Sequence, residues 1–328
     1  MTVLVTGGAG YIGAHTVRAL RANGRNVVVL DTLERGNREA VVDAELIVGD
    51  IADQELVGRI CRDHKVASVV HFAAYKAVGE SMAKPEMYWS NNVASTEKLL
   101  AVLAENKVDK FVFSSSAAVY GTPKSVPVTE TMPTMPESVY AETKLAVEKY
   151  LGSLAVHATQ PINSVSLRYF NAAGASSDNK IGEDWSSSQN LLPRVMRALL
   201  DDTFEFEIYG NDYATPDGTC IRDYIHVEDL AVAHLKALEY LEKGGNTLVC
   251  NIGTGHGTSV VQLIDLAEKI AKRKMPYTVS ARRPGDPVSV YADATLANKT
   301  LNWHATKSLQ QIVDSAYAWH STHPNGYR

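Results

Sequence analysis

Short apolar runs alternate with amphipathic segments through the first half of the chain. The apolar runs are rich in Val, Ile and Leu, and they predict strands over residues 2–6, 26–31, 45–48, 68–72, 110–114 and 164–169. The amphipathic segments predict helices over residues 12–23, 53–64, 87–105 and 139–156. Because strands that are apolar along their whole length are buried on both faces, this order predicts an α/β fold with a doubly wound parallel sheet of the Rossmann type.

The regular alternation of predicted strands and helices ends after residue 171, where Gly, Asn, Asp and Pro loops separate shorter elements. A chain of 328 residues also exceeds a typical single core. We therefore expect a dinucleotide-binding Rossmann domain over residues 1–170 and a smaller α/β substrate-binding lobe over residues 171–328. One later strand, over residues 247–252, is expected to rejoin the main sheet.

Composition narrows the possible partners and the compartment. The formal net charge of −5 comes without a basic run, which argues against a nucleic-acid partner. Three widely spaced cysteines, Cys61, Cys220 and Cys250, form no C-x-x-C motif, as is typical of a reducing compartment. No apolar stretch approaches the roughly 18 residues of a membrane helix. We expect a soluble, cytoplasmic protein without a membrane partner.

Three glycines with the spacing of a dinucleotide-binding loop directly follow the first predicted strand. Gly7, Gly10 and Gly13 satisfy G-x-x-G-x-x-G, the same loop contains G-x-G-x-x-G, and Tyr11 and Ile12 open the next helix. Glycines there permit a tight turn and allow backbone N–H groups to approach a pyrophosphate at the positive end of the helix. This strand–loop–helix context predicts a dinucleotide site.

Acidic residues end the second and third predicted strands. Asp31 lies 18 residues after the last glycine of the loop, where a carboxylate accepts hydrogen bonds from adenosine ribose hydroxyls and repels a 2′-phosphate. This favours NAD over NADP, although Arg35 and Arg38 lie close behind and argue the other way. Asp50, followed by Ile51, is placed either to contact the adenine edge or to cap its own loop.

A serine, a tyrosine and a lysine form the candidate catalytic group. Tyr140 and Lys144 are four residues apart near the start of a predicted helix, so that both side chains face one pocket. Ser114 and Ser116 follow the preceding strand, at the sheet edge where open α/β sheets bind ligands. Lys144 and a positive nicotinamide are both expected to lower the pKa of the Tyr140 phenol, which is ordinarily about 10.

At these residues the chain resembles the extended short-chain dehydrogenase/reductase family, and within it the UDP-glucose 4-epimerases (UDP-galactose 4-epimerases). The resemblance runs essentially from end to end. It includes the strings VTGG (5–8), HFAAYKAVGES (71–81), LRYFN (167–171), YGNDY (209–213), RDYIHV (222–227) and HPNGY (323–327). The segment between Asp31 and Asp50 is shorter than is common in this family, so the chain departs from the family pattern on the adenosine side.

The resemblance implies a tightly bound NAD and a transient oxidation at C4 of a UDP-hexose, an isomerase reaction that interconverts UDP-galactose and UDP-glucose. Tyr140 would be the base, Ser116 would bind the same oxygen and relay the proton, and Lys144 would hold the nicotinamide ribose and tune Tyr140. The cofactor-binding residues implied or derived above are Gly7, Gly10, Tyr11, Ile12, Gly13, Asp31, Asp50, Ile51, Phe72, Ala73, Ala74, Lys76, Asn92, Ser114, Tyr140, Lys144 and Phe170.

The UDP-sugar would be held largely by the second half of the chain. Arg222 and Arg283 are candidates for the diphosphate because guanidinium groups pair with phosphate oxygens. Asp286 is a candidate for the uridine ribose. The full set of implied substrate residues is Lys76, Ser116, Tyr140, Asn171, Asn190, Leu191, Glu207, Ile208, Tyr209, Arg222, Tyr224, Val290, Arg283 and Asp286.

Two questions of specificity and assembly follow from the resemblance. Val290 falls where some family members carry a bulky tyrosine, so Val290 either leaves room for an N-acetyl group or simply packs the lobe. A homodimer is implied through helices 87–105 and 139–156, with an apolar stripe that would equally suit a core face, formed by Ala94, Leu99, Leu100 and Leu103.

Three other functions remain as alternatives. A UDP-N-acetylglucosamine or dual-specificity 4-epimerase would use the same residues. A nucleotide-sugar 4,6-dehydratase is disfavoured because Ala117 and Ala118 follow Ser116 where that family carries Asp-Glu, and alanine transfers no protons. A non-catalytic NAD-binding sensor would not require the Ser-Tyr-Lys group. No metal site is expected, since His320 and His323 are the only close histidine pair that we identify and no third ligand is evident.

Overall fold

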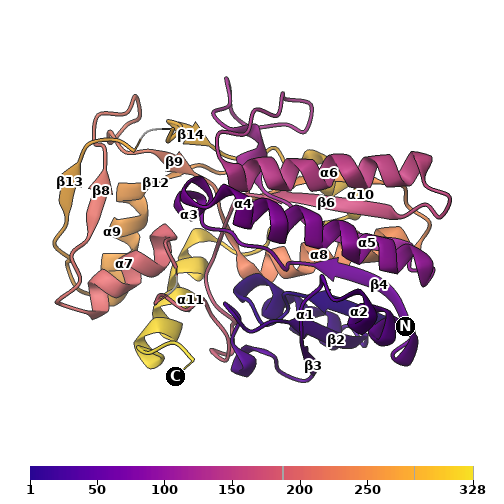
Figure 1. Cartoon of the computed structure of the whole chain (residues 1–328). Coiled ribbons are helices and arrows are strands. Elements are labelled where there is room, and N and C mark those ends of the chain that lie inside the picture. Colours follow the sequence, from indigo (N-terminus) through magenta and orange to yellow (C-terminus); the bar gives the residue numbers. More distant parts are fainter. Residues whose placement is uncertain (187, 284, 328) are drawn as a thin grey trace.

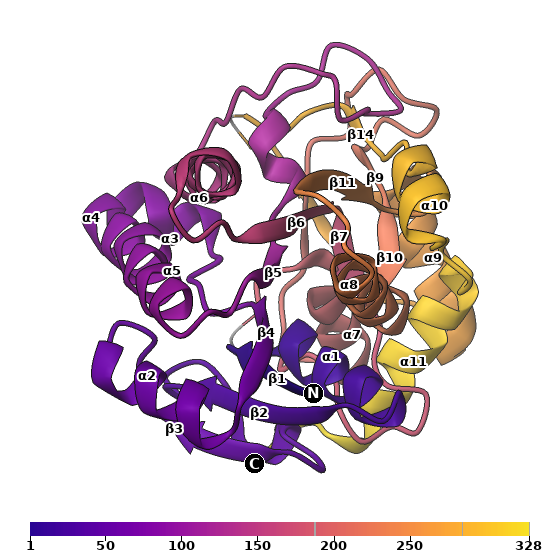
Figure 2. The same cartoon turned by 90° about the vertical axis from the view of Figure 1, so that its right-hand side faces the viewer.

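The computed structural model describes residues 1–186, 188–283 and 285–327, so that Arg328, the last residue of the predicted lobe, lies outside them. Its centre is a seven-stranded parallel sheet in the order β11-β6-β5-β4-β1-β2-β3 (Figures 1 and 2). The strands are β1 (Thr2–Thr6), β2 (Asn26–Asp31), β3 (Glu45–Val48), β4 (Val66–His71), β5 (Lys110–Ser114), β6 (Asn163–Tyr169) and β11 (Leu248–Ile252). The predicted doubly wound α/β fold is confirmed.

Helices cover both faces of this sheet, as the view along its edge shows (Figure 2). One face is covered by α1 (Tyr11–Ala22), α8 (Val227–Glu242) and α10 (Thr295–Leu301), and the other by α2 (Gln54–Asp63), α5 (Ser95–Glu105) and α6 (Val139–His157). Each face forms its own apolar cluster, because alternate residues of the buried strands point to opposite sides. Within the described residues, none of the helices is long and apolar enough to span a membrane.

The helix predicted over residues 87–105 is not continuous. The structure has α3 (Val78–Ala83), α4 (Pro85–Tyr88), a π-helical segment η2 (Trp89–Ala94) and then α5. Asn92 within η2 is buried, and its amide bonds the backbone of Tyr75 in both directions. The wider π turn accommodates this inward-facing amide, which an apolar periodicity does not reveal.

The second half of the chain contributes more to the main sheet than the sequence indicated. Helix α8, for which no prediction was made, buries residues around most of its circumference against the sheet and α1. Its amphipathic signal is weak for that reason. The strand expected over residues 247–252 is β11, which pairs in parallel with β6.

The remaining elements form a smaller lobe beside the carboxyl ends of the sheet strands (Figure 1). Its helices are α7 (Leu191–Leu200), α9 (Val260–Ala271) and α11 (Leu309–Thr322), which share one apolar cluster. Its short strands are β7 (Asn171–Ala173), β8 (Glu207–Tyr209), β9 (Ile221–Arg222), β10 (Tyr224–His226), β12 (Thr258–Ser259), β13 (Thr278–Ser280) and β14 (Ser289–Val290). Two 3₁₀ turns, η1 (Arg38–Ala40) and η3 (Ala117–Tyr120), complete the chain.

Candidate active site

The glycine loop between β1 and α1 is closely packed by backbone. Gly7 has a φ of +69°, and a Cβ there would lie 2.5 Å from the nitrogen of Ala73. A Cβ on Gly13 would lie 2.3 Å from the Gly7 carbonyl oxygen, and one on Gly10 would lie 3.3 Å from it. Side chains at Gly7 and Gly13 are therefore excluded, and the first turn of α1, beginning at Tyr11, stays open to a phosphate.

Asp31 reaches back to the glycine loop. Its buried carboxylate accepts hydrogen bonds from the backbone N–H groups of Ala9, at 3.0 Å, and Leu33, at 2.9 Å. A carboxylate offers about four acceptor positions, so Asp31 retains capacity for ribose hydroxyls. Arg35, which argued for a 2′-phosphate, is instead paired bidentately with Glu80 and lies over the ring of Tyr75.

The other predicted cofactor residues differ in what they contact. Asp50 is exposed and accepts a 2.8 Å hydrogen bond from the N–H of Ala52, while Ile51 is buried in the core. Phe72, Ala73 and Ala74 lie in the loop after β4, against Gly7 and α8. Asn92 binds this loop to α6 through Tyr75 and Thr143.

Ser116, Tyr140 and Lys144 are brought together, as their positions in the sequence suggested. Ser138 caps α6 by accepting from the N–H of Ala141, which places Tyr140 in the first helical turn. The Tyr140 phenol and the Ser116 hydroxyl line the same cavity, and Ser116 favours the ionised form of the phenol. Lys144, one turn later, donates a 2.8 Å hydrogen bond to the Ser114 carbonyl oxygen.

Burial sets the electrostatics of this group. It raises the pKa of Tyr140 well above its ordinary value, and the Ser116 hydroxyl opposes that rise only in part. Burial also lowers the pKa of Lys144 to about 7, against the opposing effect of Glu148. The expected lowering of the Tyr140 pKa is therefore not a property of the chain's own residues. It requires an added positive charge.

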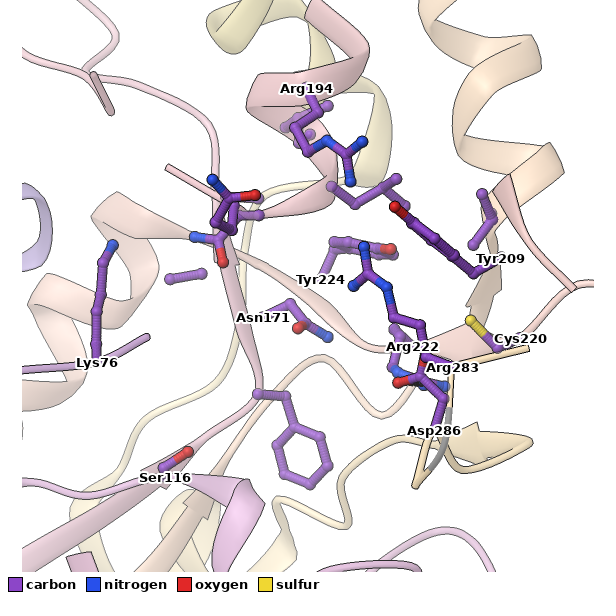
Figure 3. A pocket seen from close by; sticks show the side chains of 18 of the residues that line it. Lys76, Ser116, Asn171, Arg194, Tyr209, Cys220, Arg222, Tyr224, Arg283 and Asp286 are labelled. Atoms are coloured by element: carbon purple, nitrogen blue, oxygen red, sulfur yellow. Dashed lines mark hydrogen bonds and ion pairs between the residues drawn. The ribbon is translucent and has the colours of Figure 1, made fainter. Parts of the chain in front are cut away.

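A cavity of about 330 Å³ opens from Tyr140 and Ser116 toward the smaller lobe (Figure 3). It brings together all the residues predicted for the substrate except Val290, and three more that were predicted for the cofactor alone, Tyr11, Ile12 and Phe170. These lining residues are Tyr11, Ile12, Lys76, Ser116, Tyr140, Phe170, Asn171, Asn190, Leu191, Glu207, Ile208, Tyr209, Arg222, Tyr224, Arg283 and Asp286.

The end of the cavity away from Ser116 is rich in guanidinium groups (Figure 3). Arg222 donates to the carbonyl oxygens of Ile221 and Pro287 and pairs with Asp286 at 3.3 Å. The Arg283 guanidinium stacks over the ring of Tyr209, 3.8 Å from its centroid. Within the described residues Arg283 forms no ion pair, so its charge is available to a ligand.

Val290 is not among the lining residues of this cavity. It is 9% exposed and packs in an apolar cluster with Val128, Leu145 and Phe170, the last of which does line the cavity. Val290 therefore acts on the cavity wall from behind. Through Phe170, this packing links the size of the side chain at position 290 to the width of the cavity.

Several lining residues were not predicted from the sequence, namely Tyr169, Ala172, Ala173, Gln189, Leu192, Arg194, Cys220 and Val260. Arg194 could have been predicted from its spacing, because it lies four residues after Asn190 and therefore faces the same side of α7. Tyr169 shares a 2.9 Å hydrogen bond between hydroxyl groups with Ser114 at adjacent strand ends. The two histidines near the C-terminus stack on Trp185 and Trp319, and no group of three or more metal-ligating side chains occurs in the described part of the chain.

Comparisons with known proteins agree with this geometry. Residues 3–253 match the model of the NAD dependent epimerase/dehydratase family. The UDP-glucose 4-epimerase of Lactobacillus helveticus is 44% identical, covering 100% of this chain and 99% of that protein.

Solved structures show the same likeness. A UDP-glucose 4-epimerase from Brucella ovis in complex with NAD has a TM-score of 0.95 at 41% identity, covering 98% of each chain. One from Bifidobacterium longum, in complex with NAD+ and UDP, has a TM-score of 0.93 at 40% identity, covering 99% of this chain and 100% of that one. This chain therefore belongs to the NAD dependent epimerase/dehydratase family, and within it to the UDP-glucose 4-epimerases.

Proposed function

We propose that this protein interconverts UDP-galactose and UDP-glucose by a transient oxidation at C4 of the sugar, with NAD kept bound throughout. The observation that carries the proposal is that Ser116 and Tyr140, with Lys144 one helical turn behind Tyr140, lie at one end of a cavity whose other end is lined by arginines. One end has acid–base groups and the other has groups that suit a diphosphate. A UDP-sugar joins these two requirements in one molecule.

The residues around the glycine loop fit NAD. A side chain is sterically excluded at Gly7 and Gly13, as a close approach of pyrophosphate requires. Asp31 offers acceptors for ribose hydroxyls, and the pairing of Arg35 with Glu80 removes a cation that would favour a 2′-phosphate. We assign the adenosine side to Asp31, Asp50 and Ile51, and the nicotinamide side to Phe72–Ala74, Lys76, Asn92, Ser114, Tyr140, Lys144 and Phe170. When bound, NAD supplies a hydride acceptor and a positive charge at this end of the cavity.

Tyr140 is assigned as the base that takes the proton from the sugar 4-hydroxyl. Its position in the first turn of α6 places the phenol near the positive end of the helix dipole, which favours the phenolate. Because burial raises its pKa in the chain alone, the phenolate forms only when a further positive charge is present. Proton removal is thereby restricted to the loaded site.

Ser116 and Lys144 assist Tyr140 in the proton transfer. The Ser116 hydroxyl can both donate and accept, so it relays the proton between the sugar oxygen and the Tyr140 phenol. Lys144 is fixed on Ser114 and retains two further N–H donors for the nicotinamide ribose. The 4-keto sugar turns about its diphosphate link and presents its other face, and Tyr140 returns the proton to the 4-oxygen as C4 regains its hydride.

The opposite end of the cavity is assigned to uridine diphosphate. Arg222 and Arg283 bind the phosphate oxygens and Asp286 the uridine ribose hydroxyls. The other assigned substrate contacts are Asn171, Asn190, Leu191, Tyr224 and the backbone of Glu207, Ile208 and Tyr209, all of which line the cavity. For Val290 we propose an indirect role, through the packing of Phe170.

The competing chemistries have less support. Ala117 and Ala118 lie where a dehydratase needs an acid and a base, and both are in the 3₁₀ turn that follows Ser116. A non-catalytic NAD sensor does not require a buried phenol and a serine hydroxyl in the same cavity. A Tyr140→Phe variant with unchanged turnover would revive the sensor reading.

We also propose that the protein works as a cytoplasmic homodimer in galactose metabolism. Of the predicted stripe, Leu99 and Leu103 are buried in the core of the single chain, whereas Ala94 is exposed and Leu100 borders a surface cavity. A second cavity lies between the outer surfaces of α5 and α6, lined by Leu100, Ala101, Ala104, Glu105, Tyr150, Leu154, Ala158, Thr159 and Gln160. Small and apolar residues there suit a second copy of the same two helices. A monomer by light scattering at micromolar concentration would exclude this assembly.

The activity is tested by incubating the purified protein with UDP-galactose and no added cofactor, and following UDP-glucose by chromatography. Product without added NAD supports both the epimerase reaction and a retained cofactor. Absence of product after NAD is supplied would overturn the substrate assignment and leave the fold unaffected. UDP-N-acetylgalactosamine is then the next substrate to assay.

A further inference from the structure

Glu183 is a buried carboxylate beside the cavity that no prediction included. It lies in the loop between β7 and α7, and its side chain is 5% exposed. Its Oε1 atom accepts hydrogen bonds from Lys76 Nζ at 3.2 Å, from Ser188 Oγ at 2.8 Å and from Asn190 Nδ2 at 2.8 Å. Two of these donors, Lys76 and Asn190, line the cavity and come from opposite halves of the chain.

The C-terminal segment fixes the backbone of Glu183. The indole nitrogen of Trp319 donates to the Glu183 carbonyl oxygen at 3.1 Å. The Tyr327 hydroxyl accepts from the N–H of Gly182 at 3.0 Å and donates to its carbonyl oxygen at 2.9 Å. A Cβ on Gly182 would lie 2.4 Å from the Trp319 ring, so this peptide has no room to shift. The carboxylate is therefore held in place before any ligand arrives.

Two of the side chains that donate to Glu183 do so in place of other interactions that are open to them. Asn190 is the N-cap residue of α7, where an asparagine ordinarily accepts from its own helix, yet its side chain makes no such bond. Lys76 is 59% exposed, but its ammonium is drawn to the buried carboxylate, which otherwise lacks a countercharge among the described residues. Lys76 lies on the side of the cavity opposite Arg222 and Arg283 (Figure 3).

We infer that Glu183 is a positioning residue of the epimerase site, whose single carboxylate oxygen orients Lys76 from the nucleotide-binding half and Asn190 from the smaller lobe toward one ligand. The inference rests on the proposed function for the identity of that ligand, a nucleoside diphosphate sugar. Lys76 keeps two N–H donors, and Asn190 keeps one N–H donor and its carbonyl oxygen. Both are therefore available to the ligand while Glu183 fixes their directions.

The test is a Glu183→Gln variant, which keeps the shape and one acceptor oxygen but removes the charge. The Kd for UDP, by calorimetry, and the KM for UDP-galactose are expected to rise about tenfold, as for the loss of a hydrogen bond to a charged group, while kcat changes by less than about threefold. In a double-mutant cycle, Lys76→Met should raise the Kd for UDP by a smaller factor in the Glu183→Gln background than it does in the wild type. Additive effects of the two changes would overturn the inference.

Asp178→Asn is the matched control. Asp178 lies in the same loop and pairs with Arg18 of α1, so it also bridges the two halves, but this pair is exposed and away from the cavity. Its KM, kcat and UDP affinity should equal those of the wild type. If Glu183→Gln behaves like Asp178→Asn, the charge of Glu183 has no positioning role and the inference fails.

A second variant covers the case in which Glu183→Gln does not fold. Ser188 does not line the cavity, and its hydroxyl donates to Glu183 while accepting from the N–H of Asn190 at 3.1 Å. Ser188→Ala should raise the Kd for UDP about threefold at an unchanged kcat. An unchanged Kd would count against the inference. The UDP measurement needs no turnover, so it tests Glu183 separately from the epimerase reaction itself.

Discussion

The ammonium of Lys144 donates a 2.8 Å hydrogen bond to the carbonyl oxygen of Ser114, across the gap between helix α6 and strand β5. This bond joins the helix that carries Tyr140 to the strand that leads to Ser116. The ammonium is also 4.9 Å from the centroid of the Phe113 ring. A buried lysine held in this way supports catalysis, but burial of its charge lowers the stability of the folded protein.

Lys144→Met should separate those two effects. Burial lowers the folded-state pKa of Lys144 to about 7, below the value of about 10.4 in an unfolded chain. The unfolded state thus binds more protons between these values, and the stability of the wild type rises with pH across this window. We expect Lys144→Met, without NAD, to melt higher than the wild type at pH 7, with a difference that shrinks toward pH 10. Its kcat should fall at least about 100-fold. A melting difference that grows with pH would contradict the assignment.

Four buried histidines should make the protein sensitive to acid. Burial lowers the pKa of His71 to about 3 and those of His15, His234 and His320 to about 4. Because an unfolded histidine titrates near 6.5, stability is present above that pH and is lost as the pH falls toward 4. Each histidine contributes a slope of up to about 1.4 kcal/mol per pH unit. Melting temperatures from pH 7 to pH 4.5 measure the total.

Comparing His71→Asn with a change at an exposed histidine measures the contribution of His71 to the loss of stability in acid. The imidazole of His71 bonds Thr6 at 2.6 Å and Thr96 at 3.1 Å, so an asparagine keeps part of that bonding without the titration. The variant should be less stable at pH 7 but should lose less stability on acidification. His256→Ala, at an exposed site, should keep the wild-type slope. An unchanged slope for His71→Asn would show that His71 is not neutral in the fold.

Gly13→Ala should separate the protein from its cofactor. The new Cβ would lie 2.3 Å from the Gly7 carbonyl oxygen, which forces the loop away from the position that suits a pyrophosphate. We expect less than about a tenth of the wild-type NAD in the purified variant, measured after denaturation, and little turnover without added NAD. Gly152→Ala, in α6 with nothing within 4 Å of the new Cβ, should retain NAD. Full NAD content in Gly13→Ala would place the cofactor elsewhere.

Arg194→Leu should weaken binding of the diphosphate end of the substrate. Arg194 lines the cavity, and its guanidinium lies 5.6 Å from the centroid of the Phe206 ring without an ion pair in the described residues. Loss of one phosphate contact should raise the KM for UDP-galactose about tenfold with kcat nearly unchanged. Arg197→Leu, one turn along and paired with Asp201, is the control and should keep the wild-type KM. Equal effects of the two changes would remove Arg194 from the site.

Val290→Tyr should narrow the range of substrates. Val290 packs with Phe170 behind the cavity wall, so a larger side chain pushes that wall inward or destabilises the cluster. We expect turnover of UDP-N-acetylglucosamine by the wild type, and a ratio of acetylated to plain turnover at least about tenfold lower in the variant. The ratio is unaffected by a loss of folded protein, since both substrates are assayed on one sample. No turnover of the acetylated sugar by the wild type would end this hypothesis.

The sequence predicted those parts of the molecule whose signals are local. Strands β1, β2, β3 and β5 have the predicted bounds, because uninterrupted apolar runs between Gly, Asn and Asp leave few alternatives. Spacing along one helix was sufficient to place the Lys144 ammonium 5.9 Å from the centroid of the Tyr140 ring, although of the two only Tyr140 lines the cavity. The π segment η2 and the all-round burial of α8 depend on neighbours that are distant in the sequence, and no local pattern reveals them.

The unpredicted site residues share that dependence on distant contacts. The backbone of Glu183 is held by Trp319 and that of its neighbour Gly182 by Tyr327, both more than 130 residues away in the chain. The HPNGY string was noticed only as part of a resemblance, whereas in the structure it supports the loop that carries Glu183. The direction of the Tyr140 pKa shift likewise depends on how deeply the phenol is buried, which spacing alone does not give.

The seventh strand of the main sheet, β11, ends at Ile252, and α8 covers the face that β4, β5 and β6 present to one side. A ribosome must therefore release about three quarters of the chain before the sheet that begins at Thr2 can close. A nascent chain of the first 170 residues would expose the bare edge of β6 and an uncovered apolar face, both of which invite aggregation. Exchange of the smaller lobe between relatives would therefore have to retain α8 and β11 with the first half.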